Sequence, residues 1–205
     1  SKFIKLKESF LKNFPELDLR MLGYDVVHLG LSQYNGVAIL SKEDLTNPKF
    51  GFEVDTDPYV KDGRIISAEV NGITVISVYC PNGRDIESEH YEMKLEWFDI
   101  LKNHLQELLK INPNIVVLGD FNITPADEDV FDITKVQMTT HITTKERDKL
   151  TSILNLGFVD AYRELYPEGE GFTYWDYRGG DFNNNRGLRI DLAYVSESLK
   201  SRIKE

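Results

Sequence analysis

The chain has 205 residues, of which 41% are hydrophobic and 28% charged, as in an ordinary folded domain. Its formal net charge of −10 argues against a general binder of polyanions, because phosphate contacts are made by Lys and Arg. The single cysteine, Cys80, excludes an internal disulfide and a cysteine-based zinc site, which suits a reducing compartment. No apolar run is long enough to span a bilayer. We therefore expect one domain over residues 1–205, without membrane association, in the cytoplasm (the bacterial nucleoid) or in a eukaryotic nucleus.

The first part of the chain combines a helix with two strands. Apolar side chains recur at helical spacing over residues 3–13, which predicts a helix. Tyr24–Leu29 and Val37–Leu40 are apolar runs of strand length. Tyr34-Asn35-Gly36 lies between them and has the composition of a turn.

The middle of the chain predicts a hairpin, a long helix and a buried strand. Asn71-Gly72 is a strong two-residue turn signal, so Arg64–Val70 and Ile73–Tyr79 are expected to pair. From Glu87 to Ile111 the apolar side chains form one stripe at helical spacing, which predicts an amphipathic helix. Residues 115–118 are continuously apolar and predict a strand.

The last part adds one helix and one strand. Thr144–Leu156 is predicted to be a helix that a Thr/Glu capping pattern opens and Gly157 closes. Ile190–Val195 is the last predicted strand. Hairpins mixed with strand–helix–strand units favour an α/β (α+β) sandwich with mixed or antiparallel sheets flanked by helices. A doubly wound parallel sheet would alternate strand and helix more regularly.

A carboxylate and a carboxamide follow the buried strand at 115–118, in Gly119-Asp120-Phe121-Asn122. Hydrolysis of a phosphodiester needs a positioned water, a group that orients or deprotonates it, and cationic stabilisation of the oxygens. Asp120 suits the task of orienting water, and Asn122 can position the water or the phosphate. The alternative is that this turn only ends the strand with an Asx hydrogen bond.

A second polar segment, Tyr79-Cys80-Pro81-Asn82-Gly83, ends the predicted hairpin. A phenol at a sheet edge can bind a phosphate oxygen, and the amide of Asn82 can donate to another. The alternative is a core tyrosine before a common turn. Cys80 is expected to be a small buried thiol rather than a nucleophile.

Aromatic residues followed by an Asn- and Arg-rich loop mark the third segment, from Phe172 to Asp191. The rings of Tyr174 and Trp175 can stack on bases or wall a pocket, and Arg186 can reach a phosphate. The alternative is a set of packing aromatics beside a solvated loop. Asp191 falls one residue into an apolar strand, where we expect a buried carboxylate with a partner.

Taken together and in this order, these segments resemble the exonuclease III-type apurinic/apyrimidinic endonucleases of the endonuclease/exonuclease/phosphatase family. The form Arg186-Gly187-Leu188-Arg189-Ile190-Asp191 is specific to that branch. The matching segments are Tyr34–Ser41, Val78–Gly83, Gly119–Asn122, Phe172–Tyr177 and Gly187–Leu192.

The resemblance implies a four-layer α/β sandwich of the DNase I-like type. It implies a phosphodiesterase that cuts DNA 5′ to abasic sites, with 3′→5′ exonuclease and 3′-phosphatase activities. The implied cofactor is Mg²⁺, with Mn²⁺ as an alternative. The implied partner is double-stranded DNA with abasic sites or 3′ ends, bound by a monomer.

The resemblance also implies roles for single residues. Asp120 would orient or activate the attacking water and would bind the metal, and Asn122 would hold the water and the phosphate. Tyr79 would bind the scissile phosphate, with Asn82 and Arg84 on neighbouring backbone.

Further implied contacts lie in the C-terminal segment. Tyr174, Trp175 and Leu188 would wall the pocket of a flipped-out abasic sugar, a task for apolar side chains. Asp191 would orient the active-site histidine of the family. The remaining implied DNA contacts are Arg186 and Tyr34.

Two members of the family's catalytic set have no counterpart in this sequence. The family has a metal-binding Glu on an N-terminal strand and an Asp-His pair near the C-terminus, and the chain contains neither. We expect a domain that lacks its N-terminal strands and its C-terminal strand, with Asp120 as a partial metal site. One alternative is a catalytically inactive fragment or paralogue. Another is a phosphoesterase of the same fold that acts on a small molecule or lipid, against which the segment 186–191 argues.

Overall fold

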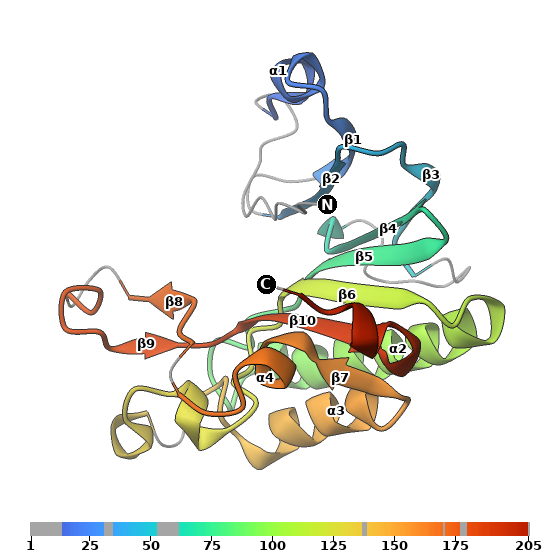
Figure 1. Cartoon of the computed structure of the whole chain (residues 1–205). Coiled ribbons are helices and arrows are strands. Elements are labelled where there is room, and N and C mark those ends of the chain that lie inside the picture. Colours follow the sequence, from blue (N-terminus) through green and yellow to red (C-terminus); the bar gives the residue numbers. More distant parts are fainter. Residues whose placement is uncertain are drawn as a thin grey trace. The chain divides into compact units, whose positions relative to one another are not determined.

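The computed structural model divides into two compact units, which are described separately (Figure 1). The first unit comprises Ser1–Tyr79 with Glu107–Gly119, and the second comprises Cys80–Gln106 with Asp120–Glu205. The helix predicted over residues 3–13 and the predicted DNA contact Tyr34 lie outside the described residues. The structure describes residues 14–30, 35–52, 62–136, 139–169, 171–176 and 180–204.

The described part of the first unit, from residue 14 on, contains a short helix followed by an antiparallel pair of strands. The short helix α1 spans Glu16–Met21 and precedes β1 (Asp25–Gly30) and β2 (Gly36–Ser41). The pair runs in register from Asp25 opposite Ser41 to Gly30 opposite Gly36. Both strands predicted here are confirmed, each with slightly different ends.

A larger sheet of the first unit contains β3 (Thr46–Phe50), β4 (Ile65–Val70), β5 (Ile73–Tyr79) and β6 (Ile115–Asp120), adjacent in that order. The predicted hairpin β4–β5 is confirmed, with positive φ at both residues of the Asn71-Gly72 turn, as a twisted two-residue turn requires. The sequence did not predict β3, which is mostly exposed and contains a proline and a lysine. Both residues are typical of an edge strand.

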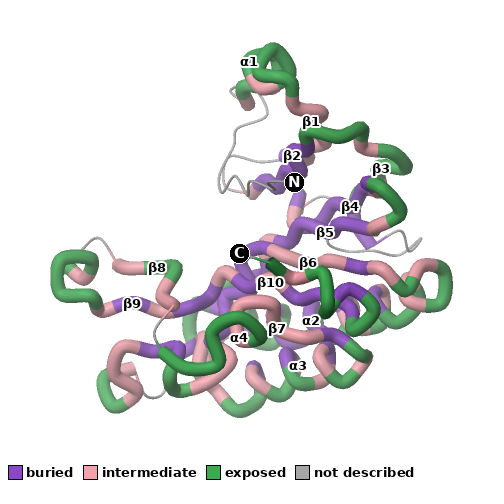
Figure 2. The backbone as a smooth tube through the Cα atoms, in the orientation of Figure 1, coloured by how far each residue is buried: buried purple, intermediate pink, exposed green. Residues whose placement is uncertain are grey.

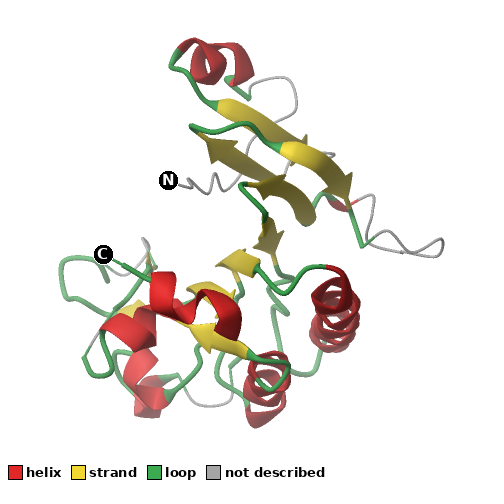
Figure 3. Cartoon of the chain, turned by 45° about the vertical axis from the view of Figure 1, so that its right-hand side comes forward, coloured by secondary structure: helices red, strands yellow, loops and turns green. Residues whose placement is uncertain are grey.

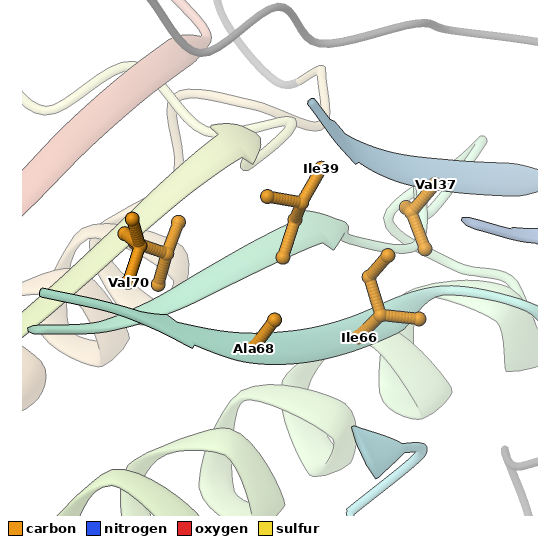
Figure 4. Packing of buried hydrophobic residues seen from close by; sticks show 6 residues of the cluster. Val37, Ile39, Ile66, Ala68 and Val70 are labelled. Carbon is orange, nitrogen blue, oxygen red and sulfur yellow. The ribbon is translucent and has the colours of Figure 1, made fainter. Parts of the chain in front are cut away.

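The core of the first unit lies between the β1–β2 pair and the larger sheet (Figure 4). Alternate residues of a strand point to the same face, so β2 contributes Val37 and Ile39 while β4 contributes Ile66 and Ala68. These residues are buried. The backbone of β2 and β4 is accordingly coloured mostly purple, for buried, in Figure 2. Sheet-on-sheet packing of β-branched residues therefore stabilises this unit.

The second unit places helices beside a short antiparallel strand pair (Figure 3). Strand β10 (Asp191–Ser196) pairs with β7 (Phe158–Asp160), and α4 (Ala161–Leu165) follows β7 directly. The long helices are α2 (Glu89–Ile111), which enters the first unit at Glu107, and α3 (Thr144–Leu154). Both long helices were predicted from the sequence and differ from the prediction only at their ends.

Aromatic contacts connect the core of the second unit. Phe121 lies 6.4 Å from Phe98 of α2 and 5.3 Å from Tyr194 of β10, between ring centroids. Tyr194 is completely buried, and burial raises the pKa of its phenol well above the usual range. No helix in the described part of the chain is long and apolar enough to cross a membrane.

Candidate active site

Backbone hydrogen bonds bring three of the predicted site segments together in the second unit. The Cys80 amide donates to the Asp120 carbonyl at 2.8 Å. The Phe121 amide donates to the Ile190 carbonyl, also at 2.8 Å. The segments that follow β5 and β6 therefore lie beside the start of β10, although they are far apart in the sequence.

The turn after β6 holds a buried carboxylate in a fixed orientation. Asp120 is fully buried, and its Oδ1 accepts a hydrogen bond from the Asn122 amide at 2.9 Å. This is the Asx turn that the sequence offered as an alternative, and Asn122 has a positive φ of 52°. Gly119 precedes it with φ 146°, and a Cβ there would lie 2.0 Å from the Val78 carbonyl oxygen. Only glycine therefore fits at that position.

The carboxamides of Asn82 and Asn122 are hydrogen-bonded to each other. Asn82 Nδ2 donates to Asn122 Oδ1 at 3.2 Å, and Asn122 Nδ2 donates to the Cys80 carbonyl at 2.8 Å. The Arg84 amide donates to Asn82 Oδ1 at 3.1 Å, while Arg84 itself is exposed. The structure therefore joins two residues that the sequence placed on separate loops.

Sequence reasoning missed a buried ion pair directly behind these amides. Lys94 of α2 is fully buried, and its Nζ lies 2.5 Å from Oε1 of Glu146, which is also fully buried. Burial lowers the pKa of Lys94, and the charge of Glu146 opposes that shift. One signal existed in the sequence, because Lys94 lies on the same buried face of the helix as Tyr91 and Leu95.

Tyr79 is the last residue of β5 and belongs to the first unit. Its ring packs half-buried against the core of that unit, 5.0 Å from the Arg64 guanidinium carbon. Arg64 Nη1 also donates to the Tyr79 carbonyl at 3.2 Å. Tyr79 ends a strand, as predicted, but its ring packs on the core, as in the alternative of a core tyrosine, and its phosphate contact stays a prediction. The next residue, Cys80, is fully buried, as expected of a small packed thiol.

The aromatic and loop segments predicted to contact DNA meet in a two-stranded sheet. Strand β8 (Tyr174–Trp175) pairs with β9 (Gly187–Leu188), with Tyr174 opposite Leu188. Sequence reasoning missed Phe182, which is 72% exposed and contacts Trp175 edge to face at 5.4 Å. The sequence contained a signal for this residue, because it is an apolar aromatic side chain within an Asn-rich segment.

Arg186, predicted to bind DNA, is ion-paired within its own loop. Its Nη2 lies 2.6 Å from Oδ1 of Asp181, and its Nε donates to the same oxygen at 2.8 Å. A phosphate would compete with that carboxylate for the guanidinium. The DNA contact of Arg186 therefore stays a prediction.

Asp191 corrects one expectation. The sequence placed it inside an apolar strand as a buried carboxylate, but it is the first residue of β10 and is only half-buried. Strand pairing with β7 begins further along, at Tyr194, so the start of β10 borders a loop. The Asp191 amide donates to Thr173 Oγ1 at 3.0 Å.

The fully buried charge of this segment is Arg189, another residue that sequence reasoning did not single out. Its Nε and Nη2 bind the two carboxylate oxygens of Asp129 at 2.6 and 3.1 Å. Its Nη1 and Nη2 bind Asp160 at 3.2 and 2.9 Å. Burial opposes the charge, but the two carboxylates outweigh it and raise the pKa of Arg189 above its ordinary value.

The described residues do not complete a metal site. Over these ranges, no three His, Cys, Asp or Glu side chains lie together in a way that could hold a metal ion. The partial metal site at Asp120 stays a prediction. The nucleases of the family depend on a metal, but these residues alone do not fit one.

The fold and the site define a class of protein. It is a mixed α/β protein in which a buried carboxylate and two hydrogen-bonded carboxamides lie at adjoining strand ends. The chain belongs to the Endonuclease/Exonuclease/phosphatase family, which matches residues 8–203.

Known proteins locate the chain within that family. It is 34% identical to exodeoxyribonuclease III of Haemophilus influenzae, over 92% of this chain and 74% of the relative. A structure of the 3′ phosphatase NExo from Neisseria, bound to a product DNA hairpin, superposes with a TM-score of 0.89 at 37% identity, over 96% of this chain and 76% of that one. An AP endonuclease from Archaeoglobus fulgidus gives 0.89 at 32% identity, over 97% and 77%.

These similarities confirm the mixed α/β fold of the DNase I-like type. They also confirm the resemblance to exonuclease III and the AP endonucleases. The chain is a hydrolytic phosphodiesterase of the DNA repair class.

Proposed function

We propose that this chain carries the catalytic site of a DNA repair nuclease that cuts the backbone 5′ to abasic sites. The same site would remove nucleotides and phosphates from 3′ ends. The observation that supports this most is the meeting of Asp120, Asn122 and Asn82 at adjoining strand ends, in a chain of this family. Relatives described as an exodeoxyribonuclease III, a 3′ phosphatase and an AP endonuclease support the three activities.

The geometry supports the roles proposed for Asp120, Asn82 and Asn122. Asp120 is held by the Asx turn and a buried strand end, so its carboxylate can orient the attacking water with little loss of entropy. The linked amides of Asn82 and Asn122 supply donors for the phosphate and the water. By the resemblance to the family alone, the Tyr79 phenol would bind the scissile phosphate, and Asp191 would orient the family's histidine, which has no counterpart in this sequence.

Recognition of the lesion is assigned to the β8–β9 sheet. Tyr174 and Leu188 lie opposite each other in this strand pair, and with Trp175 they would offer apolar side chains to a flipped-out abasic sugar, which lacks a base to stack. The partner is double-stranded DNA with abasic sites or 3′ ends, bound by a monomer in the cytoplasm or nucleus. The proposed metal is Mg²⁺, with Mn²⁺ as a substitute, because hard cations favour carboxylate oxygens such as those of Asp120.

The alternative to test is a non-catalytic member of the family that binds DNA without cutting it. Such a protein would keep the β8–β9 surface and lose turnover.

A panel of substrates separates these functions. It contains a labelled duplex with one tetrahydrofuran abasic analogue, the undamaged duplex, a duplex with a 3′ phosphate and a soluble inositol phosphate. In Mg²⁺ we expect incision of the abasic duplex and release of the 3′ phosphate, and neither in EDTA. Binding to the abasic duplex without incision would establish the non-catalytic candidate. Hydrolysis of the inositol phosphate alone would overturn the DNA assignment.

A further inference from the structure

A single buried ammonium contacts both loops of the candidate active site. Lys94 Nζ donates to the backbone carbonyl of Asn122 at 2.7 Å and to that of Asn82 at 3.2 Å. Its third N–H pairs with Glu146, and Thr140 Oγ1 lies 3.0 Å from Nζ. Lysine is almost never fully buried unless it is paired. The burial of Lys94 therefore depends on the partners that surround its ammonium. Both carbonyls belong to the residues whose side-chain amides are linked in the site.

Glu146 holds the ammonium from the opposite side. Its Oε2 accepts hydrogen bonds from the amide and hydroxyl of Thr143 at 3.0 and 2.9 Å, in the capping box that opens α3. Its Oε1 accepts from Thr140 Oγ1 at 2.7 Å and from the His141 amide at 3.0 Å. A carboxylate satisfied in this way stays ionised, and burial of Glu146 is outweighed by Lys94, which holds its pKa below the ordinary value.

Two further features fit the same arrangement. His141 Nδ1 lies 2.5 Å from the Asn122 carbonyl, and because a carbonyl only accepts, Nδ1 is the donor. Two side chains therefore fix the backbone of Asn122, a residue with positive φ. Gly83, next to Asn82, leaves the necessary space, since a Cβ there would lie 2.8 Å from Thr140 Oγ1 and 3.0 Å from Lys94 Cδ.

We propose that Lys94 and Glu146 are positioning residues for phosphodiester hydrolysis. The Lys94 ammonium holds the backbones of Asn82 and Asn122 at one point, so that their carboxamides stay hydrogen-bonded to each other and meet the phosphate as one unit. The inference rests on the proposed function. It assigns to the two helices α2 and α3 a direct part in aligning the site, in addition to their packing.

The variants are chosen to separate alignment from folding. The double variant Lys94→Met/Glu146→Gln removes both charges at nearly constant volume, and a buried ion pair replaced in this way often leaves stability unchanged. Lys94→Arg keeps a buried cation with several donors. Lys149→Met is the matched control, because Lys149 also joins α3 to α2, through an ion pair of 2.7 Å with Asp99.

Activity is read as kcat and KM on the abasic duplex in Mg²⁺. We expect the double variant to lose about 100-fold in kcat, the size of effect that a small misplacement of catalytic groups produces, while KM changes less than about threefold. We expect Lys94→Arg to recover at least about a tenth of the wild-type kcat, and Lys149→Met to match wild type. Wild-type kcat in a folded double variant would overturn the inference.

A second readout does not depend on turnover. The side-chain amide ¹H–¹⁵N signals of Asn82 and Asn122 report their mutual hydrogen bond. In the double variant we expect both signals to shift and to exchange with solvent at least about tenfold faster, with no such change in Lys149→Met. Unchanged signals contradict the positioning role. If the wild-type chain shows no cleavage but the signals change as expected, the proposed function fails while the alignment stands.

Discussion

The second unit contains two buried ion-pair networks that differ in what the cation binds. Lys94 is paired with one carboxylate and donates its other hydrogen bonds to loop carbonyls, at Asn82 and Asn122. Arg189 binds two carboxylates, Asp129 and Asp160, through side chains alone. Both cations are almost completely buried, so each charge loses its hydration when the chain folds, at a cost in free energy.

The partners decide what each network does. Arg189 connects the start of α4, where Asp160 caps the helix, with the turn at Asp129 that also binds Arg163 at 2.6 Å. This network fixes secondary-structure elements against each other. The Lys94 network fixes two loops that bear the side chains of the candidate site. We conclude that the same physical device serves stability in one place and alignment in the other.

The largest expected effect on stability comes from Arg189→Met. The substitution leaves the partly buried Asp160 without its cation and leaves the buried Asp129 with Arg163 alone, which should lower the free energy of unfolding by about 3–5 kcal/mol. Urea unfolding followed by circular dichroism measures it. Within the remaining folded protein, kcat should stay within about threefold of wild type. A stable variant with a large loss of kcat would reverse the roles that we assign to the two networks.

Acid should weaken the Lys94 network through Glu146. The pKa of this carboxyl is below its ordinary value of 4.5 in the folded chain. A group of that kind stabilises the fold above pH 4.5 and loses the contribution as the pH falls through the folded pKa. The free energy of unfolding should therefore fall less steeply with acid in Glu146→Gln than in wild type. Identical slopes in urea titrations between about pH 5 and pH 3 would show that Glu146 is not the group responsible.

Leu188→Asp tests whether Leu188, the residue next to Arg189, contacts the substrate rather than stabilising the fold. Leu188 pairs with Tyr174 in the proposed pocket wall, and a charge there disfavours an apolar sugar pocket. We expect the preference for abasic over undamaged duplex to fall about tenfold, the scale on which one apolar contact discriminates substrates. Equal losses of affinity for both duplexes, measured by fluorescence anisotropy, would remove Leu188 from the pocket.

The smallest expected effect is that of Lys149→Met. Asp99, its partner, is 54% exposed, and exposed ion pairs contribute about 0.2–1 kcal/mol. Thermal unfolding should therefore shift by only a few degrees. A loss comparable to that of Arg189→Met would show that helix–helix ion pairing, rather than burial, sets the strength of these networks.

Local rules in the sequence predicted most of the elements. The Asn71-Gly72 turn and the Thr143/Glu146 capping box each depend on neighbouring residues alone, and both were found where expected. The edge strand β3 was missed because its polar, proline-containing sequence has no alternating pattern. The division into two units was not predicted either, and the organisation as a single domain stays a prediction.

The sequence predicted residues of the site, but not the long-range hydrogen bonds and ion pairs between them. Asp120 and Asn122 stand two apart, so their Asx turn follows from sequence. A Thr/Glu capping pattern was predicted at the start of α3, but the bond of Glu146 to Lys94 spans 52 positions and depends on how α2 packs against α3. The burial of Asp191 was wrong because the pattern could not show that pairing of β10 with β7 starts beyond it. Long-range partners decide which charged side chain in an apolar segment is buried.

The most direct test of the account is single-turnover cleavage of the abasic duplex by wild type and by Asp120→Asn, with Mg²⁺ and then with EDTA. DNA affinity is measured in parallel by anisotropy. We predict metal-dependent incision by wild type, a loss of at least about 1,000-fold in Asp120→Asn, and affinities within about threefold of each other. Incision at the wild-type rate by Asp120→Asn would contradict the assignment of this carboxylate, and with it the proposed site.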